Sequence, residues 1–199
     1  AKKMGLPIDK IVIATNSNDI LSKFFQTGIY KVSKVIPTLS PSMDIQVASN
    51  FERLLYEVLN YDASLVKQYM NDLNNIGSFK IDSKNLEMLN KTFIGLSVND
   101  KMTIDRIRNT YNHNRIIIDP HTAVGLEAIY SNKINIEGPS IVLSTAHPIK
   151  FSDAVSKSID ITSKLPKKYE NISTLMEYYE FLPNNLNILK DYISSKSNV

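Results

Sequence analysis

The first long apolar run of the chain covers residues 10–16 and ends in polar side chains. An uninterrupted run, in place of strict alternation, is typical of a parallel strand that is buried on both faces. Asn18 and Asp19 follow it with the chemistry of a helix N-cap. The next apolar positions share one helical stripe, which ends at Gly28: Ile20, Leu21, Phe24 and Phe25. The pattern therefore predicts a strand, a polar turn and a helix.

The same order of apolar run, polar turn and helical stripe occurs twice more. Residues 115–118 lead into a turn at 119–122, and residues 140–143 lead into a turn at 144–148. Strands that alternate with helices are typical of layered α/β domains. We therefore predict the α/β class, with a partial, mostly parallel sheet and flanking helices.

Between the first and second of these units the pattern changes. Residues 50–112 are rich in Asn, Lys, Leu and Tyr, and their apolar positions recur at helical spacing with no clear strand. The chain after residue 163 is rich in Lys and Asn, and its apolar positions also indicate helices. We predict an α/β segment over 1–49, a helical insertion over 50–112, a second α/β segment of the same domain over 113–163, and a C-terminal helical tail over 164–199.

Composition excludes several classes of protein. The 199 residues are 43% hydrophobic and 22% charged, as in ordinary globular domains that bury a sizeable core. The net charge of +3 is too small to indicate a nucleic-acid or anionic-membrane partner, and the apolar runs are far shorter than the ~18 residues of a membrane span. The chain has no cysteine, which rules out disulfides, a thiolate nucleophile and Cys-type zinc sites. We expect a soluble, cytoplasmic protein with neither nucleic acid nor membrane as a partner.

The first five residues, Ala-Lys-Lys-Met-Gly, have the pattern of a last helical turn, with basic residues near its end and glycine after it. A helix without its first turns suggests a chain that begins inside a larger protein. Processing or a purification remnant is the alternative explanation.

The three polar turns are the candidate site. In α/β sheets, ligands gather at the carboxyl ends of the strands, where helix N-termini expose N–H groups. The turns are rich in hydroxyl, amide and imidazole groups, and two of the three histidines, His121 and His147, lie in them. Ordinary helix caps and structural histidines are the alternative for each turn taken alone. The sequence has no glycine-rich nucleotide motif, no G-x-S-x-G elbow and no metal-ligand spacing, so we expect no metal site.

Six blocks of sequence, in order, resemble the threonine synthase family in its longer bacterial and fungal form. They include Thr-Leu-Ser-Pro-Ser-Met-Asp-Ile, Asp-Pro-His-Thr-Ala-Val-Gly and Leu-Ser-Thr-Ala-His-Pro-Ile-Lys-Phe. The blocks cover residues 1–8, 13–21, 38–45, 49–55, 119–125 and 143–151. Beyond residue 151 the likeness thins to helical character.

This resemblance implies part of the large domain of a pyridoxal-phosphate enzyme of fold type II. The family converts O-phospho-L-homoserine and water into L-threonine and phosphate, and the cofactor spreads the carbanion that forms on the substrate. The family's Schiff-base lysine and glycine-rich phosphate cradle precede the block that matches Ala1. The resemblance therefore implies the C-terminal half of the enzyme, which contains no catalytic lysine, does not hold the cofactor covalently, is inactive alone, and has the N-terminal half of the same polypeptide as its partner.

The resemblance also implies roles for individual residues. Enzymes of this fold set a hydroxyl against the pyridine nitrogen, which avoids a full positive charge on the ring, and the matching residue is Thr145, with Ser144 second. The substrate contacts implied at the rim of the pocket and at the leaving phosphate are Asn16, Asn18, Asp19, His121, His147 and Lys150. Helix capping by Thr145, structural roles for the histidines and a solvated Lys150 remain alternatives.

A second class of function also remains open. A relative that kept the fold and lost the cofactor would be a non-catalytic α/β binding module, and the absent Schiff-base lysine favours it. The polar turns argue against it, because a site no longer in use is expected to drift toward apolar or random residues.

Overall fold

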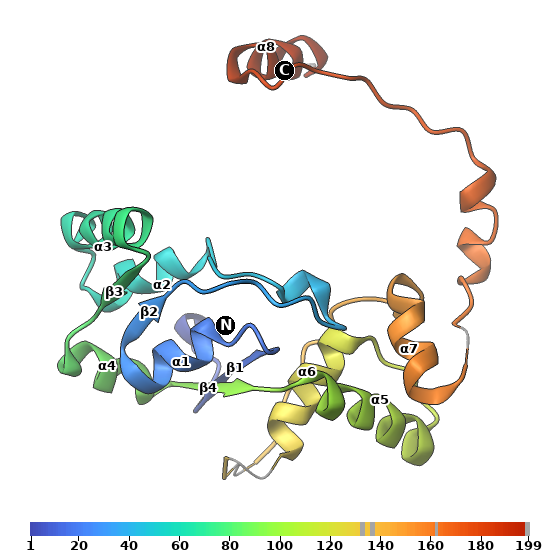
Figure 1. The fold of residues 1–199 in the computed structure, drawn as a ribbon, viewed down its shortest axis with the longest axis horizontal. Coiled ribbons are helices and arrows are strands. Elements are labelled where there is room, and N and C mark those ends of the chain that lie inside the picture. Colours follow the sequence, from blue (N-terminus) through green and yellow to red (C-terminus); the bar gives the residue numbers. More distant parts are fainter. Residues whose placement is uncertain (132–133, 136–137, 162, 198–199) are drawn as a thin grey trace. The chain divides into compact units, whose positions relative to one another are not determined.

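The computed structural model describes residues 1–131, 134–135, 138–161 and 163–197. Residues Ala1–Ser163 form one compact unit, and Lys164–Val199 form a second. In the first unit (Figure 1), strands and helices follow in the order β1 (Ile11–Thr15), α1 (Ile20–Thr27), β2 (Ile29–Lys31), α2 (Phe51–Val58), α3 (Ala63–Ile76), β3 (Ser78–Lys80), α4 (Ser83–Asn90), β4 (Phe93–Ser97), α5 (Asp100–Asn114), α6 (Pro120–Tyr130) and α7 (Ser152–Ile159).

Two small sheets organise this unit. Strands β1 and β4 pair in parallel, from Ile11 beside Phe93 to Thr15 beside Ser97, and β2 pairs with β3 in the antiparallel sense. Helix α1 packs against both β1 and β4, while α5 packs against α6 and α7 (Figure 1). The mixed α/β class with a small parallel sheet is thus confirmed.

The largest core cluster is aromatic. Phe24 and Phe25 of α1 are buried and pack edge-on against Phe51 of α2, and Tyr30 of β2 stacks on Phe79 of β3 at 5.2 Å between ring centroids. Such ring pairs add about 1 kcal/mol each to the stabilisation from apolar burial. The apolar stripe predicted over residues 20–25 therefore faces the core, as expected.

Glycine at position 95 lets strand β4 lie directly against α1. A Cβ at this position would stand 2.8 Å from the Cα of Ser22 and 2.9 Å from its carbonyl oxygen. Both are backbone atoms, which cannot turn away as the end of a flexible side chain can. Only glycine permits this close approach of strand to helix.

Two strands predicted from sequence are wrong. Residues 115–118 connect α5 to α6 as non-regular backbone, with Arg115 in the left-handed region at φ 58°, and residues 140–143 are also irregular. An apolar run becomes a strand only where a neighbouring strand accepts and donates its backbone hydrogen bonds. Neither segment has such a neighbour among the residues that the structure describes.

The region predicted as a helical insertion also contains strands. Residues 50–112 form four helices as expected, but they also contribute β3 and β4, and β4 is the parallel partner of β1. The apolar run Phe-Ile-Gly-Leu at 93–96 was the available signal, and the glycine inside it weakened the strand pattern. The division of residues 1–163 into three segments stays a prediction.

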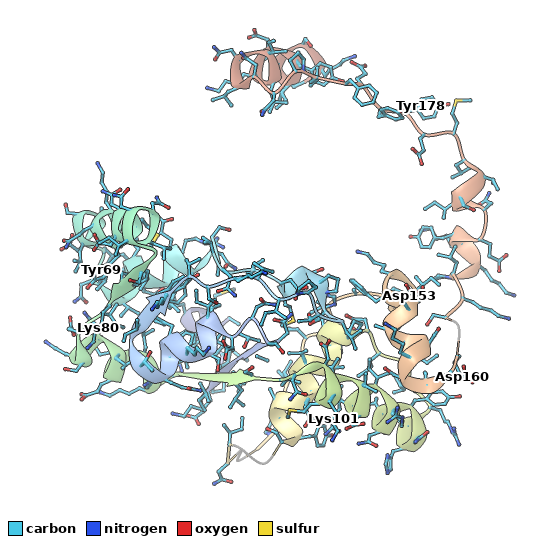
Figure 2. The ribbon with its side chains drawn as sticks, in the orientation of Figure 1. Tyr69, Lys80, Lys101, Asp153, Asp160 and Tyr178 are labelled. Carbon is cyan, nitrogen blue, oxygen red and sulfur yellow. The ribbon has the colours of Figure 1, made fainter. Side chains whose placement is uncertain are left out.

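The second unit is short, and most of its described residues are exposed. It has two 3₁₀ turns, η4 (Lys167–Tyr169) and η5 (Ile172–Thr174), and one α-helix, α8 (Leu186–Lys196). None of its helical residues is buried, and large side chains such as Tyr178 are exposed (Figure 2). In the part of the chain that the structure describes, no helix is long and apolar enough to cross a membrane.

Candidate functional site

The first polar turn holds a loop, residues 36–46, against the end of β1. Asn16 is buried, and its side-chain nitrogen donates to Asp44 Oδ1 at 2.7 Å and to Ser40 Oγ at 3.0 Å. Asn18 is also buried and donates to the carbonyl of Ile36 at 2.8 Å. Both asparagines therefore direct their amides into the protein, where they fix the loop.

Asp44 is the acceptor at the centre of this loop. Its Oδ1 accepts from the side chains of Asn16 and Asn18 at 2.7 and 3.0 Å and from the Thr38 hydroxyl at 2.7 Å, while Oδ2 accepts from the Thr38 backbone N–H at 2.9 Å. A carboxylate with four donors is a strong organiser of irregular backbone. The loop therefore has a defined conformation although it contains only one short 3₁₀ turn, η2 (Pro41–Met43).

The second polar turn is organised by Asp119, the N-cap of α6. Its buried carboxylate accepts from the backbone N–H groups of His121 and Thr122 at 2.9 and 3.4 Å, from His121 Nδ1 at 2.9 Å, and from the Thr122 hydroxyl at short range. Burial alone would raise the pKa of Asp119, but the hydrogen bonds from His121 and Thr122 outweigh it and hold the pKa below its ordinary value. Asp119 is therefore ionised near neutral pH.

His121 joins the first two turns. Its Nε2 accepts the backbone N–H of Ser42 at 3.1 Å, so this nitrogen carries no proton and Nδ1 is the one that donates to Asp119. The ring is buried and lies 4.4 Å from the Phe151 ring, centroid to centroid. His121 is thus a neutral imidazole with both nitrogens engaged inside the protein.

The third turn meets the second through Thr145. Its backbone N–H donates to Thr122 Oγ1 at 3.1 Å, and its hydroxyl lies 3.3 Å from Thr122 Oγ1 and 3.4 Å from both carboxylate oxygens of Asp119. Thr145 as a whole is exposed. The structure therefore connects all three turns in one polar network. Asn16 and Asn18 hold the loop that contains Ser42, and Ser42 donates to His121. His121 donates to Asp119, which in turn lies within hydrogen-bond distance of Thr145.

The other predicted site residues lie outside this network. Ser144, His147 and Lys150 are exposed, and His147 uses Nδ1 to accept the backbone N–H of Ile149 at 3.2 Å at the start of η3 (Pro148–Phe151). Asp19 is partly exposed and forms an ion pair with Lys23 at 2.9 Å. These four residues are exposed or partly exposed.

The sequence reasoning missed the residues that connect the turns. Asp119 and Thr122 were expected only as part of a polar turn, and Thr38, Ser42 and Asp44 only as part of one of the six blocks that carry the family resemblance. The signal for Asp119 is the Asp-Pro start of a helix, since aspartate is favoured at the N-cap and proline at the first helical position. No local pattern indicates the contact from Ser42 to His121, because 79 residues separate the two.

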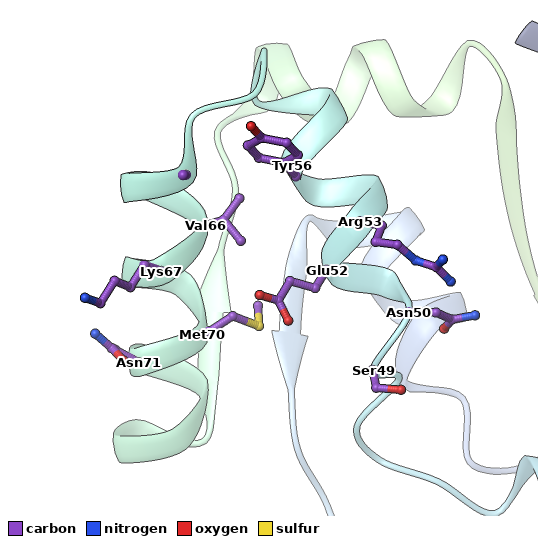
Figure 3. A pocket seen from close by; sticks show the side chains of 10 residues that line it. Ser49, Asn50, Glu52, Arg53, Tyr56, Val66, Lys67, Met70 and Asn71 are labelled. Carbon is purple, nitrogen blue, oxygen red and sulfur yellow. The ribbon is translucent and has the colours of Figure 1, made fainter. Parts of the chain in front are cut away.

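Two open grooves lie elsewhere in the first unit. One, of about 590 Å³, runs between α2 and α3 and is lined by Tyr56, Val66 and Met70 among others (Figure 3). A second, of about 540 Å³, is lined by residues of α5 and α7, including Arg108 and Lys157. Neither groove includes a residue of the polar network. In the described ranges, no group of three or more acidic, histidine or cysteine side chains is arranged to hold a metal.

Comparison with known proteins identifies relatives of this chain. The family model "Threonine synthase, C-terminal" matches residues 122–193. A threonine synthase of Pseudomonas aeruginosa is 34% identical over 199 residues, which is all of this chain and 42% of that protein.

Solved structures agree with the sequence match. Threonine synthase from Brucella melitensis, solved with pyridoxal phosphate bound, superposes with a TM-score of 0.88 at 38% identity, over 100% of this chain and 43% of that one. Yeast threonine synthase superposes with a TM-score of 0.81 at 36% identity, over 97% of this chain and 43% of that one. The chain thus spans about two fifths of the length of these relatives.

Proposed function

Because this chain belongs to the threonine synthase family, whose C-terminal part it matches, we propose that it works as the C-terminal part of a threonine synthase. The whole protein would convert O-phospho-L-homoserine and water into L-threonine and phosphate, in the cytoplasm. Similarity over the full chain to an enzyme solved with pyridoxal phosphate is the observation that carries this proposal. The rest of the polypeptide, which corresponds to the remaining three fifths of the relatives, would be its partner.

Pyridoxal phosphate is the cofactor of the proposed reaction, and the chemistry of the third turn fits it. When bound, the cofactor draws electron density from the substrate carbon next to its amino group. Thr145 suits a contact with the ring nitrogen, because the residue is exposed while its backbone N–H is fixed on Thr122. Ser144 is the neighbouring hydroxyl, also exposed. We assign no Schiff-base lysine to this chain.

The six residues expected at the substrate divide into two groups. We propose that Asp19, His147 and Lys150 touch the substrate, since these residues are exposed or partly exposed. The positive charge of Lys150 suits the phosphate group, and the carboxylate of Asp19 suits the amino group. Asn16, Asn18 and His121 are buried and saturated with internal hydrogen bonds, so we propose that they shape the pocket rim by fixing the loop at 36–46.

The test compares the full-length protein with the 199-residue chain alone. Given pyridoxal phosphate and O-phospho-L-homoserine, the full-length protein should release phosphate and form threonine in equal amounts. The chain alone should do neither, because it would hold only part of the site. If the full-length protein binds no cofactor and forms no threonine, the proposal fails. A non-catalytic α/β binding module is then the alternative function that remains. Turnover by the chain alone would overturn the division of the site between the two parts.

A further inference from the structure

The short turn η2, in the middle of the loop at 36–46, is tied to a distant element by one hydrogen bond. The Ser42 backbone N–H donates to His121 Nε2 at 3.1 Å. The other hydrogen bonds that η2 makes in the described chain stay within residues 40–45. Met43 adds an apolar contact with the core cluster that includes Val124. The His121 ring is therefore the polar attachment of η2 to the second polar turn.

The base of the same loop has ties of its own. Asn16 and Asn18 donate to Asp44, and the Leu39 backbone N–H donates to Asp100 Oδ1 at 3.2 Å. None of these bonds involves a histidine. Loss of the contact with His121 would therefore free η2 while the base of the loop stays in place.

The contact with Ser42 exists in only one protonation state of the imidazole. Nε2 carries no proton, because it accepts, while Nδ1 donates to Asp119 at 2.9 Å. A proton added to Nε2 would leave two N–H groups facing each other across 3.1 Å with no acceptor between them. The imidazolium form therefore excludes the hydrogen bond from Ser42.

The surroundings of the ring allow it to take up that proton. Buried charges need a partner of opposite charge, and the ionised Asp119 carboxylate already lies against Nδ1. Among the described residues, Asp119 is the one charged group within hydrogen-bond distance of the ring. The neighbours from other elements are uncharged: the Ser42 N–H of η2 and the Phe151 ring of η3, 4.4 Å away between centroids.

We propose that His121 is a positioning residue whose neutral imidazole holds η2 in place, and that protonation of Nε2 releases η2 from the second polar turn. Acid would thus loosen the middle of the loop at 36–46 without breaking the bonds at its base. The release needs no cofactor. Its consequence, weaker binding of substrate at low pH, rests on the proposed function, so the two can fail separately.

Amide hydrogen exchange in the full-length protein tests the release between about pH 8 and pH 5, where imidazoles titrate. Exchange of the peptide that contains Ser42 is measured by mass spectrometry and compared with the intrinsic rate at each pH. We expect its protection to fall about fivefold on acidification, which corresponds to one hydrogen bond, while a peptide from β1 keeps its protection. Equal protection of the Ser42 peptide at both ends of the range would overturn the inference, whether or not the enzyme is active.

Two variants separate protonation from loss of the ring. In His121→Gln the side-chain amide oxygen takes the place of Nε2 and accepts the Ser42 N–H at every pH in the range. In His121→Asn the side chain is too short to reach Ser42. We expect protection that is high and constant with glutamine, and low and constant with asparagine. A glutamine variant that loses protection on acidification as the unaltered protein does would contradict the inference, and if neither variant folds, the titration of the unaltered protein still decides it.

His113→Gln is the matched control. His113 is exposed in the last turn of α5, and its Nδ1 lies 2.8 Å from the Asn109 carbonyl oxygen, to which it donates. A second proton on the other ring nitrogen therefore breaks no hydrogen bond of the described chain. The protection of the Ser42 peptide should fall on acidification in this variant as in the unaltered protein. A profile made flat by His113→Gln would assign the effect to the wrong histidine and overturn the inference.

The consequence for substrate is measured by comparing KM for O-phospho-L-homoserine in the unaltered enzyme and in His121→Gln. Acid also protonates the substrate phosphate, but this affects both enzymes equally. We expect KM to rise more on acidification in the unaltered enzyme, with kcat changing alike in the two. Parallel KM profiles would overturn the link between η2 and substrate binding, while the exchange experiment decides the release by itself.

Discussion

At the scale of single residues, the Asp119 side chain has several structural roles in the candidate site. It caps α6, fixes the tautomer of His121 and lies beside Thr145. A buried carboxylate is costly unless its hydrogen bonds are made, and here the donors of α6 and the His121 ring make them. Removing this one side chain therefore leaves several buried donors without a partner at once.

We predict that Asp119→Ala lowers the free energy of unfolding by about 3 kcal/mol, from the lost cap and the unpaired donors together. Asp62→Ala is the control, because Asp62 caps α3 through one exposed hydrogen bond to Leu65 N, and it should cost about 1 kcal/mol. Urea unfolding of the two variants measures both values. Equal costs would show that the network around Asp119 adds nothing to an ordinary cap.

Acid should remove the contribution of Asp119. Its pKa is lowered in the folded chain, so the stabilisation is complete above its unfolded pKa of about 3.9 and is lost as the pH falls through the lower folded value. The difference in stability between the unaltered chain and Asp119→Asn should therefore shrink below pH ~4. Urea unfolding at neutral and acid pH checks this, and a difference that grows on acidification would contradict the assigned direction of the pKa.

At the scale of elements, the parallel pair of β1 and β4 fixes where the first polar turn lies. The Ser97 hydroxyl at the end of β4 donates to the Asn16 carbonyl at 3.1 Å, which ties the turn to the sheet. Helix α1 follows this turn and covers both strands. The spacing between strand and helix depends on the missing side chain at Gly95, so the sheet, the helix and the turn share one constraint.

We predict that Gly95→Ala destabilises the chain by about 2 kcal/mol or more, because the new Cβ meets backbone atoms of Ser22 at 2.8 and 2.9 Å. Gly125→Ala is the matched control in α6. Its new Cβ meets only the side-chain carbon Val142 Cγ1, at 3.2 Å, and alanine favours the helix by about 1 kcal/mol. Thermal unfolding compares them, and a Gly95 variant as stable as the Gly125 variant would refute the close approach.

The elements also show what could be predicted from the sequence. Strand β1 and helix α1 are local: an apolar run, cap chemistry and a terminal glycine suffice, and the structure has both where they were expected. Residues 140–143 carry a similar pattern but form no strand, because a strand also needs a hydrogen-bonded neighbour that no local pattern specifies. The polar turns were predictable from residue type, whereas the link from Ser42 to His121 depends on the tertiary fold.

At the scale of the whole molecule, the first unit keeps large apolar side chains in solvent. Ile141 is 81% exposed and Leu143 is 76% exposed, within the segment whose apolar run predicted a strand. Met4 and Ile116 are also exposed. Because the chain spans only about two fifths of its relatives, we propose that the rest of the polypeptide covers these side chains.

We predict that the 199-residue chain, studied alone, associates with itself as its concentration rises and binds a dye specific for apolar surface. Ile141→Lys together with Leu143→Lys should reduce both effects. Size-exclusion chromatography and dye fluorescence are the measurements. A clean monomer that binds no dye would contradict the proposal that this surface is buried in the complete protein.

We propose that this chain is one part of a threonine synthase whose site is shared with a preceding part. Sequencing the gene upstream of the Ala1 codon tests it most directly. We predict that the reading frame continues and encodes a glycine-rich phosphate loop and, further upstream, a lysine for the cofactor. A start codon immediately before Ala1 would contradict the claim, since the polar turns would then have no second half of an active site to complete.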